Sequence, residues 1–288
     1  MKPGRALETL IEHLEKALSD NPNVTIESPK RLPDKVTGRL REHDVVLTFK
    51  EHHHELKVAF ECRDRSRPVT VEQVEGFSRK CEDTGIQQGV LVSSKGFWET
   101  ALTKAASYGI RCLSIEEATS SFDWLFSDEL VEVIPHVQQI SVRAILAQGH
   151  TLTDGGKYYI ADSNGNELPY EFWFEIVSDL LFNPYYMNPD GSTQRQVTFH
   201  HNGDGAFIFD EASNNLLPVQ ELVLEVKYEV ELQSHPFQFL KYTDKGDDSD
   251  IADVALSQLP FEDTSVEVGI VYQPGKGGKL IIVDEKLE

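Results

Sequence analysis

The sequence predicts an α/β domain with a mixed central sheet over residues 1–118, followed by a mainly antiparallel β domain over residues 130–288. Apolar residues near the start of the chain recur with helical spacing, and the elements that follow alternate between strands and helices. Later in the chain the pattern changes to a strict alternation with period two, interrupted by repeated turn signals. The 288 residues suffice for two domains, and we expect residues 119–129 to form the linker.

The first domain is predicted to begin with an amphipathic helix over residues 4–19, which ends at the turn-forming segment 20–23. Two strands at 44–49 and 56–63 are expected to pair as a hairpin around residues 50–55. The resulting order of elements, α-β-β-β-α-β-α-β, is typical of a compact α/β domain. The other elements expected here are a strand over 24–26, a helix over 70–83, a strand over 89–93, a helix over 97–108 and a strand over 110–114.

In the second domain the clearest signal is the segment 221–232, where every second residue is apolar and most of the others are charged. A long, half-buried strand has this pattern. We expect an acidic, β-sandwich-like domain that contains a short helix over 171–181, with 120–128 as a linker or edge helix. Turn signals that separate further strands occur at residues 154–156, 164–166, 190–191, 202–205 and 275–278.

Composition excludes several classes of protein. With 40% hydrophobic residues and no apolar run near 18 residues, membrane-spanning, fibrous and wholly disordered chains are excluded. The first residues lack the apolar core of a secretion signal, so we expect a cytoplasmic protein. Cys62, Cys81 and Cys112 show no metal-binding spacing, and we expect them to be reduced thiols in the core.

The net charge of −21 is distributed unevenly. Residues 1–118 contain 18 Lys and Arg against 19 Asp and Glu, whereas residues 119–288 contain 9 against 29, which gives −1 and −20. Because an acidic surface repels the phosphate backbone, any contact with DNA is expected in the N-terminal domain. The acidic domain is expected to bind a protein partner, to self-associate, or to mimic the charge of DNA.

The residues that point to chemistry lie on the two hairpin strands. Glu61 and Arg63 stand two apart on one strand and therefore share a face. If the hairpin turns near residue 52 or 53, Asp44 pairs with residue 61 or 62, so the two carboxylates could converge. Such a pair suits Mg²⁺, which takes oxygen ligands, and a nearby cation could stabilise a phosphate under attack. The alternative is an ordinary surface salt bridge.

Several further segments occur in an order that, taken together with this triplet, resembles the Mrr-type restriction endonucleases of the PD-(D/E)XK nuclease superfamily. The resemblance covers about residues 4–115 and implies a mixed sheet flanked by helices. It implies that Asp44 and Glu61 are metal ligands, that Glu8 of the first helix completes the site, and that Arg63 stands where the family has a catalytic lysine. The segments are 4–8 (GRALE), 37–44 (TGRLREHD), 60–63 (FECR), 68–71 (PVTV) and 91–97 (LVSSKGF), followed by Ala101, Ala105 and Ala106.

The activity implied by the resemblance is Mg²⁺-dependent (or Mn²⁺-dependent) hydrolysis of DNA phosphodiester bonds by an endonuclease, in restriction or defence. Arg63 keeps the positive charge of the expected lysine and can grip phosphate, but it cannot lose a proton. Activity therefore survives if this residue only orients water and stabilises charge. The second hypothesis is a catalytically degenerate nuclease fold that serves as a structural or protein-binding module.

Other residues carry weaker signals. Arg65, Arg67 and Lys95 are candidate contacts to DNA phosphates, with a solvated surface or an ordinary helix cap as the alternative. Gln73 could support the site by holding residues that contact the metal, although a plain surface glutamine is the preferred interpretation. The histidines at 52–54 are expected to be a solvated hairpin tip, and the aspartates between 244 and 253 a solvated loop without calcium-binding spacing.

Overall fold

The chain folds into two compact units, the first made of residues 1–130 and 235–288 and the second of residues 131–234. The structure is a computed structural model, and it describes residues 5–181, 183, 194–203, 205–261 and 264–283. Each unit contains its own hydrophobic core.

The first unit is organised around a nine-stranded sheet with the strand order β1-β4-β5-β6-β7-β13-β14-β15-β16. The centre, β5-β6-β7, is parallel, and the remaining pairs are antiparallel. A mixed sheet with helices is therefore confirmed. Its elements are α1 (Arg5–Leu18), β1 (Val24–Glu27), β2 (Lys30–Pro33), β3 (Leu40–His43), β4 (Val45–Glu51), β5 (His54–Arg63), α2 (Val71–Thr84), β6 (Gln88–Ser93), α3 (Glu99–Ser107), β7 (Arg111–Glu117), β13 (Gln238–Asp244), β14 (Ser249–Phe261), β15 (Thr264–Gln273) and β16 (Gly277–Val283).

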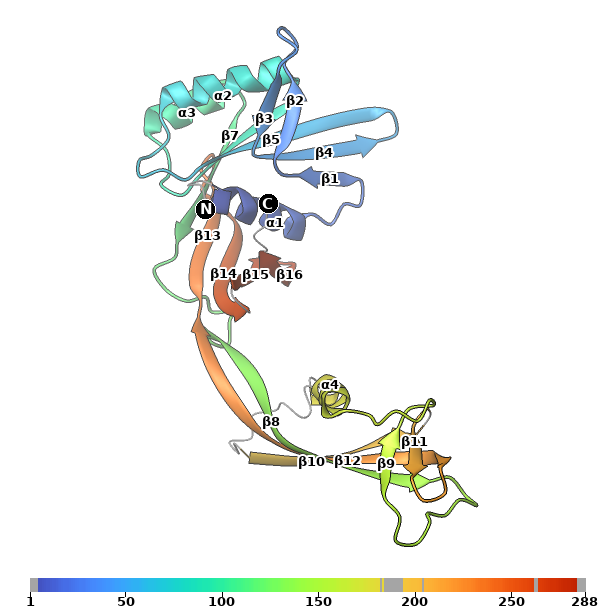
Figure 1. Cartoon of the computed structure of the whole chain (residues 1–288). Helices are drawn as coiled ribbons and strands as arrows, with labels where there is room; N and C mark the ends of the chain where they lie inside the picture. The colour runs from blue at the N-terminus through green and yellow to red at the C-terminus, as the bar shows by residue number, and fades with distance from the viewer. Residues whose placement is uncertain (1–4, 182, 184–193, 204, 262–263, 284–288) are drawn as a thin grey trace. The chain divides into compact units, whose positions relative to one another are not determined.

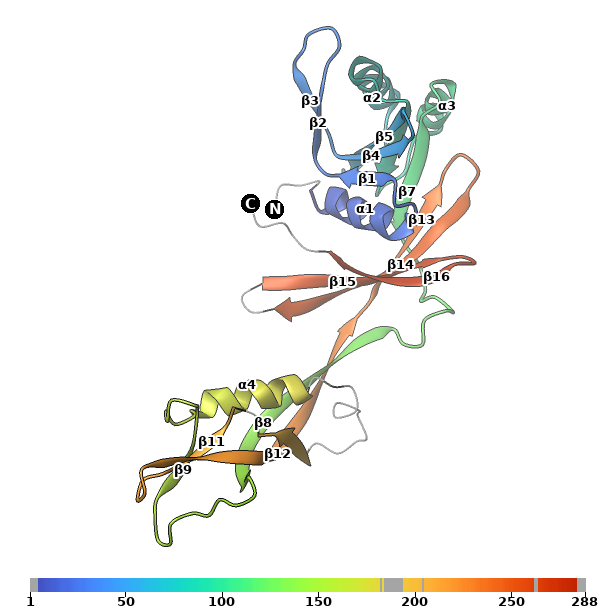
Figure 2. The same cartoon turned by 90° about the vertical axis from the view of Figure 1, so that its right-hand side faces the viewer.

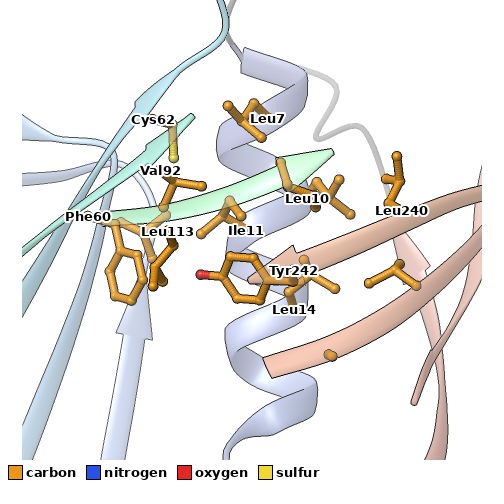
Figure 3. Close-up of a cluster of buried hydrophobic side chains, with 14 of the residues drawn as sticks. Leu7, Leu10, Ile11, Leu14, Phe60, Cys62, Val92, Leu113, Leu240 and Tyr242 are labelled. Atoms are coloured by element: carbon orange, nitrogen blue, oxygen red, sulfur yellow. The ribbon is translucent and has the colours of Figure 1, made fainter. Parts of the chain in front are cut away.

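The helices cover opposite faces of this sheet. Helices α2 and α3 lie side by side on one face, and α1 lies between the N-terminal strands and β14–β16 on the other (Figures 1 and 2). Because side chains alternate along β5, Phe60 and Cys62 enter the core around α1, which Figure 3 shows in close-up. Glu61 is thereby directed toward α2, whose inner face buries Phe77 and Cys81.

The last four strands belong to the first unit. β13 pairs with β7, with Leu240 opposite Glu117, and continues the sheet through β14, β15 and β16. Tyr242 of β13 is fully buried, and its hydroxyl donates a hydrogen bond to Glu15 of α1 over 3.0 Å. Residues 235–288, which we expected to form one β-sandwich-like domain with 130–234, instead cover the α1 core, because β7 ends the parallel sheet with an edge that can accept another strand.

The second unit consists of a five-stranded sheet and one helix. Strands β10, β12, β11 and β9 are neighbours in that order, and β8 also pairs with β12. Trp173, Val177 and Leu181 of the helix pack on Leu224 and Val226 of β12. The antiparallel character and the helix are confirmed. The elements are β8 (Glu129–Leu146), β9 (Tyr158–Ala161), α4 (Tyr170–Leu181), β10 (Gln194–Asn202), β11 (Phe207–Asp210) and β12 (Asn215–Pro236).

Some local features differ from expectation. The hairpin of β2 and β3 was not predicted, because its strands are short and mostly polar. Segment 120–128 is not helical; Phe122 and Trp124 there stack on each other. The turn signal at 190–191 lies outside the described residues. The three cysteines are free and buried, as expected.

Candidate active site

Asp44 and Glu61 occupy adjacent positions on neighbouring strands. β4 and β5 pair with Val45 opposite Phe60, and the hairpin turns after Glu51, so Asp44 lies one step beyond, level with Glu61. The backbone N–H of Cys62 donates a hydrogen bond to Asp44 Oδ2 over 2.6 Å. The expected register is thus present, and the two carboxylates lie at the same end of the hairpin.

The carboxyl group of Asp44 is electrostatically unusual. Burial and the neighbouring carboxylates of Glu61 and Glu8 together raise its pKa to about 7, against the opposing effects of the Cys62 hydrogen bond and of Lys80. Asp44 therefore sits close to half-protonated at neutral pH in the protein alone. A bound divalent cation would favour the ionised form, so this group is suited to metal binding.

Glu61 is held between two cations. Arg63 Nη2 donates to Glu61 Oε1 over 2.7 Å, and Lys80 Nζ of α2 donates to Glu61 Oε2 over 2.6 Å. The side chain of Glu61 is only 12% exposed, that of Arg63 22% and that of Lys80 16%. Both carboxylate oxygens therefore have a cationic partner, and each keeps a second lone pair with which it could coordinate a metal.

Glu8 lies on α1 within electrostatic reach of this group. The pKa of Glu8 is raised overall, mainly because the side chain is partly buried. The carboxylates of Glu42 and Glu61 also raise it, and the charge of Arg5 opposes the rise. Among the residues that the structure describes, no three His, Cys, Asp or Glu side chains are arranged at metal-ligand spacing. In chemical type, though not in spacing, the carboxylates of Glu8, Asp44 and Glu61 match a hard cation, because they supply only oxygen ligands.

Lys80 is a site residue that sequence reasoning missed. It lies 19 positions after Glu61 in the chain, and only the packing of α2 on the sheet joins the two. One signal was available: Lys80 is three residues after Phe77 and one before Cys81, apolar residues four apart that share one face of the helix, so a lysine there borders the buried face.

The other predicted residues have diverse surroundings. Gln73 accepts a hydrogen bond from the backbone N–H of Thr70 over 2.9 Å, as part of a helix cap. Arg65 and Arg67 are exposed in the loop after β5. Lys95 lines an open cavity of about 570 Å³ together with acidic side chains, and α3 begins four residues later, so Lys95 does not stand at a helix N-terminus. The acidic neighbours of Lys95 in this cavity are Asp64, Glu116, Glu117 and Glu267.

A mixed sheet with an aspartate and a glutamate at the end of a β-hairpin is the arrangement expected of restriction-endonuclease-type domains. Residues 34–120 match the model of the Mrr_cat family, described as restriction endonuclease. This segment is therefore an Mrr-type restriction endonuclease domain, as the resemblance predicted. The match includes Asp44, Glu61, Arg63 and Lys80 but begins after Glu8.

The other comparisons add little. A solved structure titled "Crystal Structure of Protein of Unknown Function AF1548" is similar at 16% identity and a TM-score of 0.31, over 38% of this chain and 56% of that one. The chain thus spans little more than half the length of that protein. No curated protein matches the sequence. Among the described helices, none is both long and apolar enough to cross a membrane.

Proposed function

We propose that the first unit is a metal-dependent endonuclease that hydrolyses DNA phosphodiester bonds, in restriction or defence against foreign DNA. The observation that carries this proposal is the adjacent placement of Asp44 and Glu61 within the segment matched by the restriction endonuclease model. The two carboxylates are the proposed ligands of Mg²⁺ or Mn²⁺, and Glu8 is the proposed third ligand.

The proposed reaction is attack of water on phosphorus. A bond forms between the water oxygen and phosphorus and the bond to one sugar oxygen breaks. The attacking water gives up one proton, and the leaving oxygen takes up one, so the net reaction adds one water molecule. When bound, the divalent cation supplies the Lewis acidity that makes the phosphate ester reactive toward water. The Cys62 N–H holds Asp44 in place, and the cations beside Glu61 favour negative charge developing on the phosphate.

DNA is favoured as the substrate by the local charge around the site. The segment 30–43, which forms the β2–β3 hairpin and leads directly into Asp44, contains five Lys and Arg against two Asp and Glu in a chain of net charge −21. We propose that this hairpin, together with Arg65 and Arg67, contacts DNA phosphates. The acidic neighbours of Lys95 disfavour a phosphate at that residue.

The test is incubation of the purified protein with supercoiled plasmid and Mg²⁺ or Mn²⁺. We expect the parent to nick the plasmid, and Asp44→Asn and Glu61→Gln, which keep the shape but remove the charge, to slow nicking by about 100-fold or more. Glu99→Gln at the exposed start of α3 is the matched control and should nick like the parent. Equal nicking by all four proteins would identify a contaminating nuclease.

A second candidate function is a catalytically degenerate nuclease fold that acts as a binding module. The observation that favours it is the pairing of both Glu61 oxygens with Arg63 and Lys80, which balances the charge of that carboxylate without a metal. In that case the parent should bind DNA or a protein partner yet leave plasmid intact with either metal.

A further inference from the structure

Lys80 contacts the site from a helix, on the side of Glu61 opposite to Arg63. Its ammonium lies 2.6 Å from Glu61 Oε2, and only 16% of its side chain is exposed. A charge so far removed from water loses hydration, so a surface ion pair of ordinary kind does not explain its placement.

The two cations reach Glu61 from different elements. Arg63 contacts Glu61 Oε1 from two residues further along the same strand, β5, whereas Lys80 contacts Glu61 Oε2 from α2, which covers this face of the sheet. The ammonium of Lys80 therefore reaches the carboxylate from the helix and not from the strand.

The two side chains also differ in how they present their donors. An ammonium has three N–H donors that turn about one bond, and Glu61 takes one of those of Lys80. The guanidinium of Arg63 fixes its five donors in one plane; its Nη2 is bound to Glu61, and its Nε is buried without a partner among the described residues. Lys80 can therefore keep its hold on Glu61 and turn a remaining donor toward a phosphate oxygen or toward water.

The backbone around Lys80 is tied to β3, the strand that leads directly into Asp44. The Thr84 hydroxyl donates to the carbonyl oxygen of Lys80 over 2.7 Å, and His43 Nε2 lies 2.9 Å from the same hydroxyl. His43 is fully buried and directly precedes Asp44. These bonds fix α2 against β3, so the lysine and the aspartate keep a constant spacing.

We propose that Lys80 is a catalytic residue of this unit: its ammonium contacts the phosphate under attack while Arg63 anchors Glu61 from the other side. The inference rests on the proposed nuclease function and deepens it. In this proposal two elements share the task of contacting the phosphate and holding Glu61: α2 supplies Lys80 and β5 supplies Arg63. The triplet 61–63 of a single strand would otherwise perform both.

The experiment compares Lys80→Met, the double variant Lys80→Met/Arg63→Lys and the control Lys104→Met in plasmid nicking. Lys104 of α3 is also paired with a glutamate, Glu75 of α2, but this pair joins the two helices and does not include Glu61. We expect Lys80→Met to slow nicking by about 100-fold, the double variant to recover to within about tenfold of the parent, and the control to be unchanged. A purely structural lysine at position 80 would not be replaced by one at position 63.

The affinity for Mn²⁺, measured by calorimetric titration without DNA, provides a readout besides activity. Removing a positive charge beside the carboxylates should tighten Mn²⁺ binding by Lys80→Met by about threefold or more, although nicking is slower. A nicking rate of Lys80→Met within about threefold of the parent's rate would overturn the role of Lys80 but not the proposed nuclease function. Loss of Mn²⁺ binding together with failed rescue would show a structural role and also overturn it. A parent that never nicks DNA refutes the proposed function and this role with it.

Discussion

At the scale of single residues, Asp44 combines burial with like charge. Its carboxylate receives the Cys62 N–H, yet burial and the nearby Glu61 raise its pKa to about 7. An aspartate in a purely structural position would be expected to find compensating partners that keep its pKa low. The uncompensated charge is therefore a cost to folding that a ligand can remove.

This cost predicts a pH dependence of stability. Because the pKa of Asp44 is higher in the folded than in the unfolded protein, its favourable contribution is complete below the unfolded value of about 4 and is lost as the pH rises toward 7. Between about pH 5 and pH 8 the free energy of unfolding of the parent should fall by roughly 2 kcal/mol relative to that of Asp44→Asn. Urea unfolding of both proteins at the two pH values measures the difference.

Asp247→Asn is the matched control for this measurement. Hydrogen bonds from Ser249 lower the pKa of Asp247, so its contribution to stability is present above the unfolded pKa and lost on acidification, the opposite sign. If Asp44→Asn and the parent showed the same dependence on pH, the raised pKa of Asp44 would be contradicted.

At the scale of elements, the β2–β3 hairpin connects the site to a basic surface. Arg41 near its base is ion-paired with Asp83 of α2 over 2.9 Å, and Lys35 near its tip donates to the carbonyl oxygen of Glu82. These contacts hold the hairpin against the last turn of α2, next to Lys80. Val36 at the tip is 79% exposed and Arg39 is exposed as well, as suits a two-stranded ribbon that enters a DNA groove.

We expect the hairpin variant Lys35→Ala/Arg39→Ala to bind duplex DNA more weakly in the presence of Ca²⁺. Each lost phosphate contact should reduce the slope of log affinity against log salt by about one. Fluorescence anisotropy at several salt concentrations measures this slope, with Lys104→Ala as the control. An unchanged slope would show that the hairpin does not contact the backbone.

At the scale of the whole molecule, the division into units changes the meaning of the charge. The first unit contains 23 Lys and Arg against 33 Asp and Glu, and the second contains 4 against 15, which gives −10 and −11. The N-terminal segment is nearly neutral, but the strands that complete its sheet are acidic. The proposed DNA binding would therefore depend on local basic surfaces, and a protein partner or self-association of the acidic second unit stays a prediction.

The shared sheet predicts how the chain tolerates deletions. Residues 1–130 alone should not unfold cooperatively. Removing β13–β16 exposes the core around α1 to water and takes away Tyr242, which is buried in that core. Replacing 131–234 by a short Gly-Ser linker should preserve a cooperative transition, since Asp128 and Phe237 are already joined by a backbone hydrogen bond of 3.0 Å. Thermal unfolding followed by circular dichroism compares the two proteins. Cooperative unfolding of the 1–130 fragment would contradict the shared core.

The sequence by itself determined most helices and strands of the N-terminal segment, although not the β2–β3 hairpin, and the pairing of Asp44 with Glu61. Both follow from short-range pattern: period-two alternation marks the strands, and a tight hairpin sets the register of residues on either side of its turn. Only the tertiary structure decided that β13 pairs with β7 and that Lys80 pairs with Glu61. Alternation shows that one face of a strand is buried but not which edge it joins, and helical spacing shows which face packs but not which charge lies opposite. Contacts of this kind depend on the packing of whole elements, and the proposed role of Lys80 depends on one of them.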